Sequence, residues 1–341
     1  MSVKFRGITV RDGVLLRGPA QWSEFSPFWG YHVPYSARWL LGAIDTAVRG
    51  FPPVRRSEIP VNVTVPAVPA EQAAQIALSL GADTAKVKVA ELGQEVDQDL
   101  RRLAAVREAL GKTAKIRIDV NGKWDLETAL DLLPKYNRAA GGLEYVEQPC
   151  LDVADLARIR RRNLGIPIAA DESIRRAADP FQVLEKSAAD LIIVKNQPLG
   201  GVRAVLELLA EIPLPAVVSS ALESSLGLAA GLHLAAAMPQ LSSACGLGTA
   251  KLFAADVSSN ALTAVRGRLQ MREIQPDLLL QAYRDTELAS FAASSVLPSV
   301  ETWRKWAHRL AQVWSYCQER RWISAQCTYR LAPYLNCRRE P

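Results

Sequence analysis

Several kinds of motif are absent from this chain of 341 residues, and each absence excludes a class of protein. No apolar run approaches the roughly 20 residues that cross a bilayer, so a membrane span is not expected. The nucleotide, hydrolase and zinc motifs GxGxxG, GxSxG and HExxH do not occur. The three histidines lie on different segments, which makes a Ser/His/Asp triad or a zinc site unexpected. What remains is a chain that is 49% hydrophobic and 22% charged, as in an ordinary globular enzyme.

Cysteine is also scarce, and its number is odd. None of the five cysteines forms a CxxC pair, and no signal peptide is apparent at the start of the sequence. We therefore expect a protein of the reducing cytoplasm with free cysteines rather than a disulfide framework. The cysteines are Cys150, Cys245, Cys317, Cys327 and Cys337.

The formal net charge of +6 raises the question of an anionic partner. Residues 256–341 hold 12 Lys and Arg against 8 Asp and Glu, yet the basic residues are mostly dispersed, so nucleic-acid binding is not expected. Residues 300–322 carry an apolar stripe with basic residues around it, which predicts an amphipathic helix. We expect this helix to dock on its own protein, with binding to a partner subunit or a membrane surface as the alternative. The last twenty or so residues show no clean period, as in disordered segments.

A regular rhythm of charged residues is the strongest positive signal. Five short apolar runs each end in a charged residue, and turn residues and a helix-like stretch follow each run. Their spacing of about 25 to 30 residues is typical of a repeated β/α unit, which needs a strand, two loops and a crossover helix. The charged residues are Lys88, Asp119, Glu147, Asp171 and Lys195.

The same spacing locates three further strands, at residues 61–67, 215–220 and 240–248. Eight parallel strands covered by helices close into a barrel whose chemistry lies at the C-terminal strand ends. The predicted fold class is therefore α/β, a (β/α)7β TIM-like barrel. A small α+β capping domain is expected to come from the N-terminus and the C-terminal flank.

These predictions divide the chain into three parts. Residues 1–60 form the short cap, residues 61–255 the catalytic barrel, and residues 256–341 a flank that completes the cap and ends in a basic helical tail. Within the cap we expect a hairpin with Asp12-Gly13 at its turn, followed by a helix over Tyr35–Arg49.

Three carboxylates on successive strands, Asp119, Glu147 and Asp171, are expected to converge at the barrel rim. Oxygen-only ligands suit Mg²⁺, with Mn²⁺ as a substitute, and such a cation keeps positions open for a substrate carboxylate. A small-molecule carboxylate is therefore the expected substrate.

Lys88 and Lys195 would flank that ligand from opposite sides of the barrel. Lys86 lies two residues from Lys88 and so points to the same side, where each ammonium group lowers the pKa of the other and can bring one of them toward the range of a general base. Arg117 and Asn121 alternate with Asp119 and are expected to support it. A solvated strand face is the alternative, but the inward face of a barrel strand is not solvated, and charged residues are almost never buried unpaired.

At these residues the chain resembles the enolase superfamily, in its muconate lactonising subgroup. That subgroup has K-x-K on strand two, metal carboxylates on strands three to five and a lysine on strand six. Within it the chain is most similar to the o-succinylbenzoate synthase family in its actinobacterial form, over about residues 1–280. The supporting phrases are WSEFSPF, RIDVNGKW, EYVEQP, AADES and SSALESSLGLAAGLHLAAA.

The resemblance implies a Mg²⁺-dependent lyase of menaquinone biosynthesis. Its reaction is the syn dehydration of 2-succinyl-6-hydroxy-2,4-cyclohexadiene-1-carboxylate to o-succinylbenzoate through an enediolate. Lys88 would act as base and then acid, with Lys195 as the stabilising cation. Substrate contacts are expected from Ser219, Ser220 and Gly246, and from the cap loop at residues 24–29.

Two other functions stay open. An N-acylamino acid racemase, or another enzyme of the subgroup, would use the same two lysines as acid and base on opposite faces. A noncatalytic binding protein that has kept the barrel is the second alternative, against which the intact set of charged residues argues.

Overall fold

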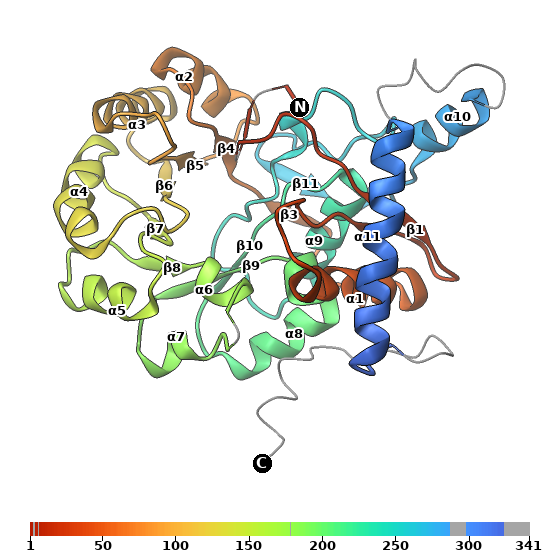
Figure 1. The fold of residues 1–341 in the computed structure, drawn as a ribbon. Helices are drawn as coiled ribbons and strands as arrows, with labels where there is room; N and C mark the ends of the chain where they lie inside the picture. The colour runs from red at the N-terminus through yellow and green to blue at the C-terminus, as the bar shows by residue number, and fades with distance from the viewer. Residues whose placement is uncertain (3, 6, 178, 287–297, 324–341) are drawn as a thin grey trace.

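The computed structural model of the chain describes residues 1–323 apart from residues 3, 6, 178 and 287–297 (Figure 1). The predicted disordered end, with Cys327 and Cys337, lies outside the described residues. Cys150, Cys245 and Cys317 are free and buried. Within the described part of the chain, no helix combines the length and the apolarity needed to cross a bilayer.

The N-terminal part forms an antiparallel hairpin, β1 (Val14–Arg17) and β2 (Trp22–Phe25), followed by α1 (Val33–Arg49). The predicted turn at Asp12-Gly13 is wrong, because these residues precede β1. Residues 18–21 make the turn instead, closed by a bond from Gly18 N to Gln21 O of 3.1 Å. Gly13 is needed for a close approach, since a Cβ atom there would lie 2.7 Å from Ser26 Cβ.

Seven parallel strands form one sheet in sequence order, and helices cover its outer face (Figure 1). Each strand is formed by a largely apolar run, and its outward-facing apolar side chains are buried between the sheet and the helices. The strands are β4 (Val63–Val65), β5 (Thr84–Lys88), β6 (Lys115–Asp119), β7 (Tyr145–Glu147), β8 (Ile168–Ala170), β9 (Leu191–Val194) and β10 (Ala216–Val218). The helices are α2 (Ala70–Leu78), α3 (Val96–Leu110), α4 (Leu126–Ala139), α5 (Val153–Arg161), α6 (Glu172–Arg175), α7 (Gln182–Glu185), α8 (Val202–Glu211) and α9 (Ser225–Ala237), with 3₁₀ turns η1 (Gln197–Leu199) and η2 (Ala250–Leu252).

The eighth strand, predicted over residues 240–248, is reduced to two isolated bridges at Cys245 and Gly246. Cys245 N donates to Pro60 O at 2.8 Å, and Gly246 N donates to Val218 O at 2.8 Å. The segment thus connects the two edges of the sheet without running alongside either of them. The predicted fold class is confirmed, with an eighth strand much shorter than expected.

The C-terminal part returns to the first part of the chain. Strand β11 (Arg268–Gln270) pairs antiparallel with β3 (Glu58–Pro60), and α10 (Asp277–Thr286) and α11 (Val300–Glu319) follow. Helix α11 packs across α1 (Figure 1), and its apolar stripe is buried in a shared cluster, so the predicted docking on its own protein is confirmed. The cluster contains Phe25, Trp39, Leu40, Trp306, Val313 and Cys317. The predicted domain boundaries stay a prediction.

Candidate active site

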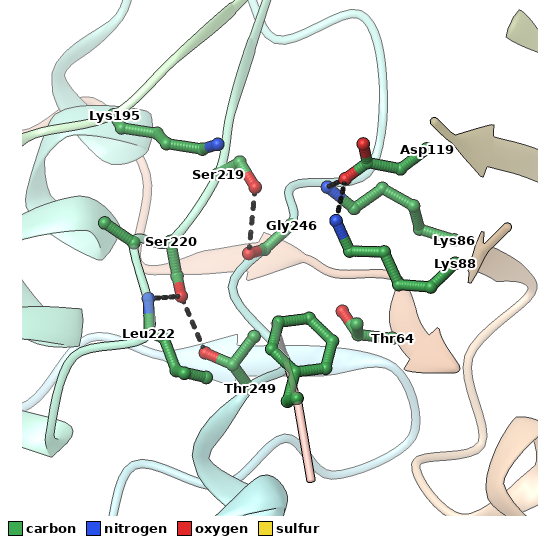
Figure 2. A pocket seen from close by; sticks show the side chains of 12 residues that line it. Thr64, Lys86, Lys88, Asp119, Lys195, Ser219, Ser220, Leu222, Gly246 and Thr249 are labelled. Atoms are coloured by element: carbon green, nitrogen blue, oxygen red, sulfur yellow. Dashed lines mark hydrogen bonds and ion pairs between the residues drawn. The ribbon is translucent and has the colours of Figure 1, made fainter. Parts of the chain in front are cut away.

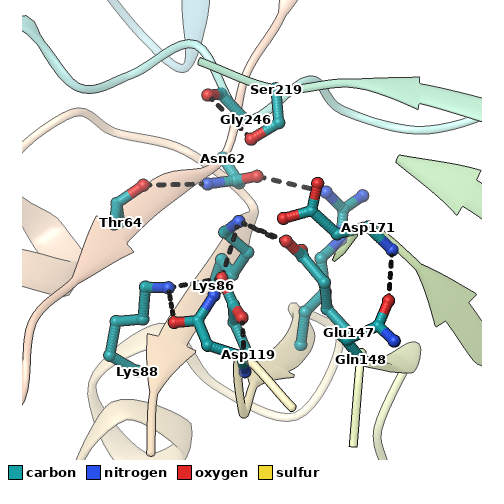
Figure 3. A network of polar contacts seen from close by, with 12 residues as sticks. Asn62, Thr64, Lys86, Lys88, Asp119, Glu147, Gln148, Asp171, Ser219 and Gly246 are labelled. Carbon is teal, nitrogen blue, oxygen red and sulfur yellow. Dashed lines mark hydrogen bonds and ion pairs between the residues drawn. The ribbon is translucent and has the colours of Figure 1, made fainter. Parts of the chain in front are cut away.

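Lys86 and Lys88 on β5 both point into the barrel, as the strand alternation predicts. They are 6% and 4% exposed, which is rare for lysine and requires partners. Strand pairing sets Lys88 beside Asp119, and Asp119 beside Glu147. Lys88 Nζ donates to Asp119 Oδ2 at 2.5 Å, and Lys86 Nζ lies between Asp119 Oδ2, at 3.2 Å, and Glu147 Oε2, at 3.0 Å (Figure 3).

The third predicted carboxylate, Asp171, directly follows β8 and is fully buried. Lys195 Nζ, from the end of β9, donates to Asp171 Oδ2, and Arg175 Nε donates to Asp171 Oδ1 at 2.9 Å. The structure therefore brings all five residues of the sequence rhythm to the mouth of the barrel. Each carboxylate is neutralised by at least one buried cation.

These charges shift one another's ionisation. Burial together with the charge of Asp119 raises the pKa of Glu147 to about 7. Burial alone would raise the pKa of Asp119, but the charges of Lys88 and Lys86 hold it well below its usual range. In the same way, Arg175 and Lys195 lower the pKa of Asp171 in spite of its burial. Likewise against burial, Glu147 and Asp119 raise the pKa of Lys86.

The donor set fits a hard divalent cation. Three buried carboxylates come from adjacent strand ends, and carboxylate oxygens are the ligands that such a cation prefers. Nearby, Glu172 Oε2 is buried without a hydrogen-bond partner. Within the described ranges, no group of three or more His, Cys, Asp or Glu side chains is placed so that it could hold a metal ion without rearrangement. The lysine contacts explain this, because ammonium groups hold the oxygens that a cation would bind.

A cavity of about 20 Å³ lies between the lysines (Figure 2). Figure 2 shows Lys195 entering from the side opposite Lys86 and Lys88, with Ser219 and Gly246 between them. Because one water needs roughly 10 to 15 Å³, the lining must move before a ring-containing substrate can enter. The lining also includes Phe5, Thr64, Asp119, Ser220, Ala221, Leu222 and Thr249. All three predicted substrate contacts, Ser219, Ser220 and Gly246, are therefore in the wall.

Comparison with known proteins agrees with this geometry. Residues 69–276 match the family model described as Enolase C-terminal domain-like, and residues 1–47 match Enolase N-terminal domain-like. The o-succinylbenzoate synthase of Thermobifida fusca (strain YX) is 53% identical over 274 residues, which cover 80% of this chain and 86% of that protein. The chain belongs to the o-succinylbenzoate synthase family of the enolase superfamily.

A second relative supports this family assignment, and a solved structure shares the fold. The o-succinylbenzoate synthase of Mycobacterium ulcerans (strain Agy99) is 50% identical over 278 residues, covering 81% of this chain and 83% of that protein. The structure of muconate cycloisomerase from Pseudomonas fluorescens superposes with a TM-score of 0.67 at 21% identity, covering 80% of this chain and 92% of that chain. The second likeness shows the fold alone. Members of the enolase superfamily use a divalent metal.

The two predicted supporting residues occupy different depths. Asn121 lies at the mouth, where its Oδ1 accepts from Lys88 Nζ at 2.6 Å and its Nδ2 donates to Glu172 Oε1 at 3.3 Å. Arg117 lies one layer deeper than the predicted rim position, because it precedes Asp119 by two residues on β6. It binds Glu144, Asn62 and the carbonyl of Ala244 inside the barrel, and it does not line the cavity.

Three residues with contacts in the site were missed by sequence reasoning. Gln148, directly after β7, accepts from Asp171 N at 2.8 Å and so ties two rim strands together. Arg175 holds Asp171, as described above. The ring of Phe5 lies 5.5 Å from Lys88 Nζ and forms part of the cavity wall. The phrase EYVEQP contains the signal for Gln148, whereas nothing local marks Arg175 or Phe5.

Phe28 of the cap loop at residues 24–29 packs against the cluster of Phe5, Leu222 and Leu252, and the predicted contact of this loop with the substrate stays a prediction. None of its residues is among those that line the cavity. Glu24 instead accepts hydrogen bonds from Ser224 N and Gly227 N, both at 3.2 Å, at the N-terminus of α9. Four free N–H groups at a helix start attract a carboxylate, so this loop joins the cap to the barrel.

Proposed function

We propose that this chain performs the o-succinylbenzoate synthase reaction in menaquinone biosynthesis, the syn dehydration of 2-succinyl-6-hydroxy-2,4-cyclohexadiene-1-carboxylate. One observation carries the proposal. The chain is 53% identical to an o-succinylbenzoate synthase, and two lysines of its barrel face one cavity from opposite sides beside three buried carboxylates.

Lys88 is the proposed base. Its Nζ reaches the cavity and is oriented by Asp119 and Asn121. Lys88 takes the proton from the carbon that bears the ring carboxylate, and then returns it to the hydroxyl that leaves from the same face. One C–H bond and one C–O bond break, a C=C bond forms, and water departs. Because a single group handles both proton transfers, the elimination is syn.

Lys195 is the proposed electrostatic partner. Its ammonium group lies across the cavity from Lys88 and stabilises the enediolate as negative charge develops on the substrate carboxylate. The buried setting strengthens this interaction because little water screens it.

Asp119, Glu147 and Asp171 would hold the metal, which we propose to be Mg²⁺ with Mn²⁺ as a substitute. When bound, the cation supplies positive charge to the substrate carboxylate and so makes loss of the α-proton easier. Lys86 neutralises two of these carboxylates in the arrangement seen here and thereby keeps them in place.

Ser219, Ser220 and Gly246 are the proposed contacts to the rest of the substrate. Ser220 Oγ lies 2.8 Å from Thr249 Oγ1 and also accepts from Leu222 N, so this wall is internally ordered (Figure 2). The partner is thus a small-molecule carboxylate, and the proposed location is the cytoplasm.

A substrate panel tests the proposal. Purified protein with Mg²⁺ is offered the cyclohexadiene carboxylate and, separately, N-succinyl amino acids, and we expect dehydration of the first. The placement of the two lysines across one cavity also suits racemisation, which would appear as loss of optical activity in the second group. Failure to dehydrate the first substrate contradicts our proposal, and turnover of neither would favour a noncatalytic binding protein.

A further inference from the structure

A buried arginine of the C-terminal helix donates hydrogen bonds to the cap. Arg309 of α11 is 8% exposed, and Arg309 Nη2 donates to Phe28 O and to Tyr31 O, both at 2.7 Å. Among the residues that the structure describes, no carboxylate forms an ion pair with it. A buried cation whose partners are carbonyl oxygens fixes backbone geometry, because those oxygens can neither rotate away nor titrate.

The segment bound by Arg309, from Phe28 to Tyr31, is a tight turn that leads into α1. Tyr31 N donates to Phe28 O at 3.0 Å, and Arg309 Nη2 also donates to Ser36 Oγ at 3.0 Å in the first turn of α1. The His32 side chain provides no cap at the start of this helix. Arg309 therefore joins the turn to the helix that follows it.

Tyr31 is held at both ends, and its far end faces the proposed metal site. Its hydroxyl accepts from Arg175 Nη1 at 3.3 Å, and the hydroxyl of Tyr35 accepts from the same atom at 3.4 Å. Arg175 in turn donates to Asp171 Oδ1 at 2.9 Å. A continuous path thus runs from Arg309 through Tyr31 and Arg175 to Asp171.

Phe28 begins a second path, toward the cavity wall. The guanidinium carbon of Arg11 lies 4.4 Å from the centre of the Phe28 ring, and Arg11 Nε donates to Leu222 O at 2.8 Å. Leu222 lines the cavity and has a φ of 66°, a conformation that is unfavourable for leucine unless its surroundings enforce it.

We propose that Arg309 is a positioning residue of the active site: by fixing the turn from Phe28 to Tyr31, it holds Arg175 against Asp171 and steadies the wall at Leu222. Helix α11 lies outside both segments matched by the family models, 1–47 and 69–276. The inference rests on the proposed metal site at Asp171. It assigns to α11 a function in the site, beyond covering the cap.

Metal affinity without substrate tests the inference. Arg309→Met keeps the volume of the buried stem but removes every donor. We expect its Kd for Mn²⁺, measured by electron paramagnetic resonance, to rise about three- to tenfold, at the lower end of what loss of a ligand's hydrogen-bonded support costs. Val313→Ala is the matched control, since Val313 is fully buried on the same helix and should lower the melting temperature while leaving that Kd unchanged.

Tyr31→Phe removes only the hydroxyl at the other end of the path and serves if Arg309→Met does not fold. We expect it to raise the Kd for Mn²⁺, and the effects of the two changes to be less than additive, because both act through Arg175. Unchanged affinity in both variants would reduce Arg309 to a stabilising residue and overturn the inference, as would a parent protein that binds no Mn²⁺. A parent that binds Mn²⁺ without dehydrating the cyclohexadiene substrate contradicts only the proposed function.

Discussion

Buried charges occur in two regions of this molecule, and their partners differ. At the barrel mouth, Lys86 and Asp119 pair with opposite charges on nearby strands. At the junction of cap and barrel, Glu24 and Arg309 bind main-chain groups and hydroxyls. An ion pair between side chains can be exchanged when a cation or a substrate arrives, whereas a bond to the main chain stays as long as the fold does. The first region is suited to chemistry and the second to holding the frame.

The largest expected effect is at the mouth. Lys88→Ala removes the proposed base, and we expect kcat to fall by about 10² to 10⁴, the usual range for general acid–base catalysis. Steady-state kinetics with the cyclohexadiene substrate measures this. Lys112→Ala, at an exposed lysine, is the control and should leave kcat unchanged. Undiminished turnover in Lys88→Ala would remove it from the mechanism.

Asp119→Asn comes next, because it takes one charge from the metal-binding set. We expect the Kd for Mg²⁺, from calorimetry in the absence of substrate, to rise at least tenfold, since a neutral amide is a weaker ligand for a hard cation. Asp131→Asn changes an exposed carboxylate on α4 and should not alter it. If Asp119→Asn binds Mg²⁺ as the parent does, the metal site is misplaced.

Removal of Glu24 from the junction should lower stability and leave metal affinity unchanged. Glu24→Ala leaves Ser224 N and Gly227 N without their acceptor, and we expect the free energy of unfolding to fall by about 1 to 3 kcal/mol. Urea denaturation measures this, with Glu108→Ala at an exposed site as the control. A large change in Mg²⁺ affinity in Glu24→Ala would contradict the assignment of a purely structural role to Glu24.

The last expected effect, similar in size to that of Glu24→Ala, depends on pH. Burial and the nearby charge of Glu24 raise the pKa of Glu223 from 4.5 to about 7 in the folded state. Its contribution to stability is therefore complete below pH 4.5 and is lost as the pH rises through 7. Relative to the parent, Glu223→Gln should gain about 1 to 3 kcal/mol in free energy of unfolding between pH 5 and pH 8. An identical difference from the parent at both pH values would show that Glu223 does not titrate in this range.

Much of the barrel could be predicted from the sequence because its signals are local. Five of the strands are apolar runs that end at a charged residue, and strand alternation alone brings Lys86 and Lys88 inward. The eighth strand was overestimated because a short mixed run such as QLSSACGLG looks the same whether it forms a strand or a single bridge. The hairpin turn was misplaced because Gly13 serves close packing against Ser26 and not a turn.

The junction could not be predicted, because its partners are distant and are not side chains of matching charge. Arg175 reaches Tyr35 across 140 residues, and Arg309 reaches Pro27 across 282. Every residue has a main-chain carbonyl, whatever its side chain. The sequence around residue 309 therefore does not indicate what its guanidinium binds.

The two bridges at Cys245 and Gly246 leave the barrel with a narrow seam. It is joined by two backbone hydrogen bonds at each edge, including Asn62 N to Cys245 O at 2.9 Å and Ser220 N to Gly246 O at 2.9 Å. Short, sparsely bonded stretches open first in native proteins, so these amides should exchange with solvent sooner than those of β5 or β6. Because Ser220 and Gly246 also line the small cavity, we expect opening of the seam to widen that cavity.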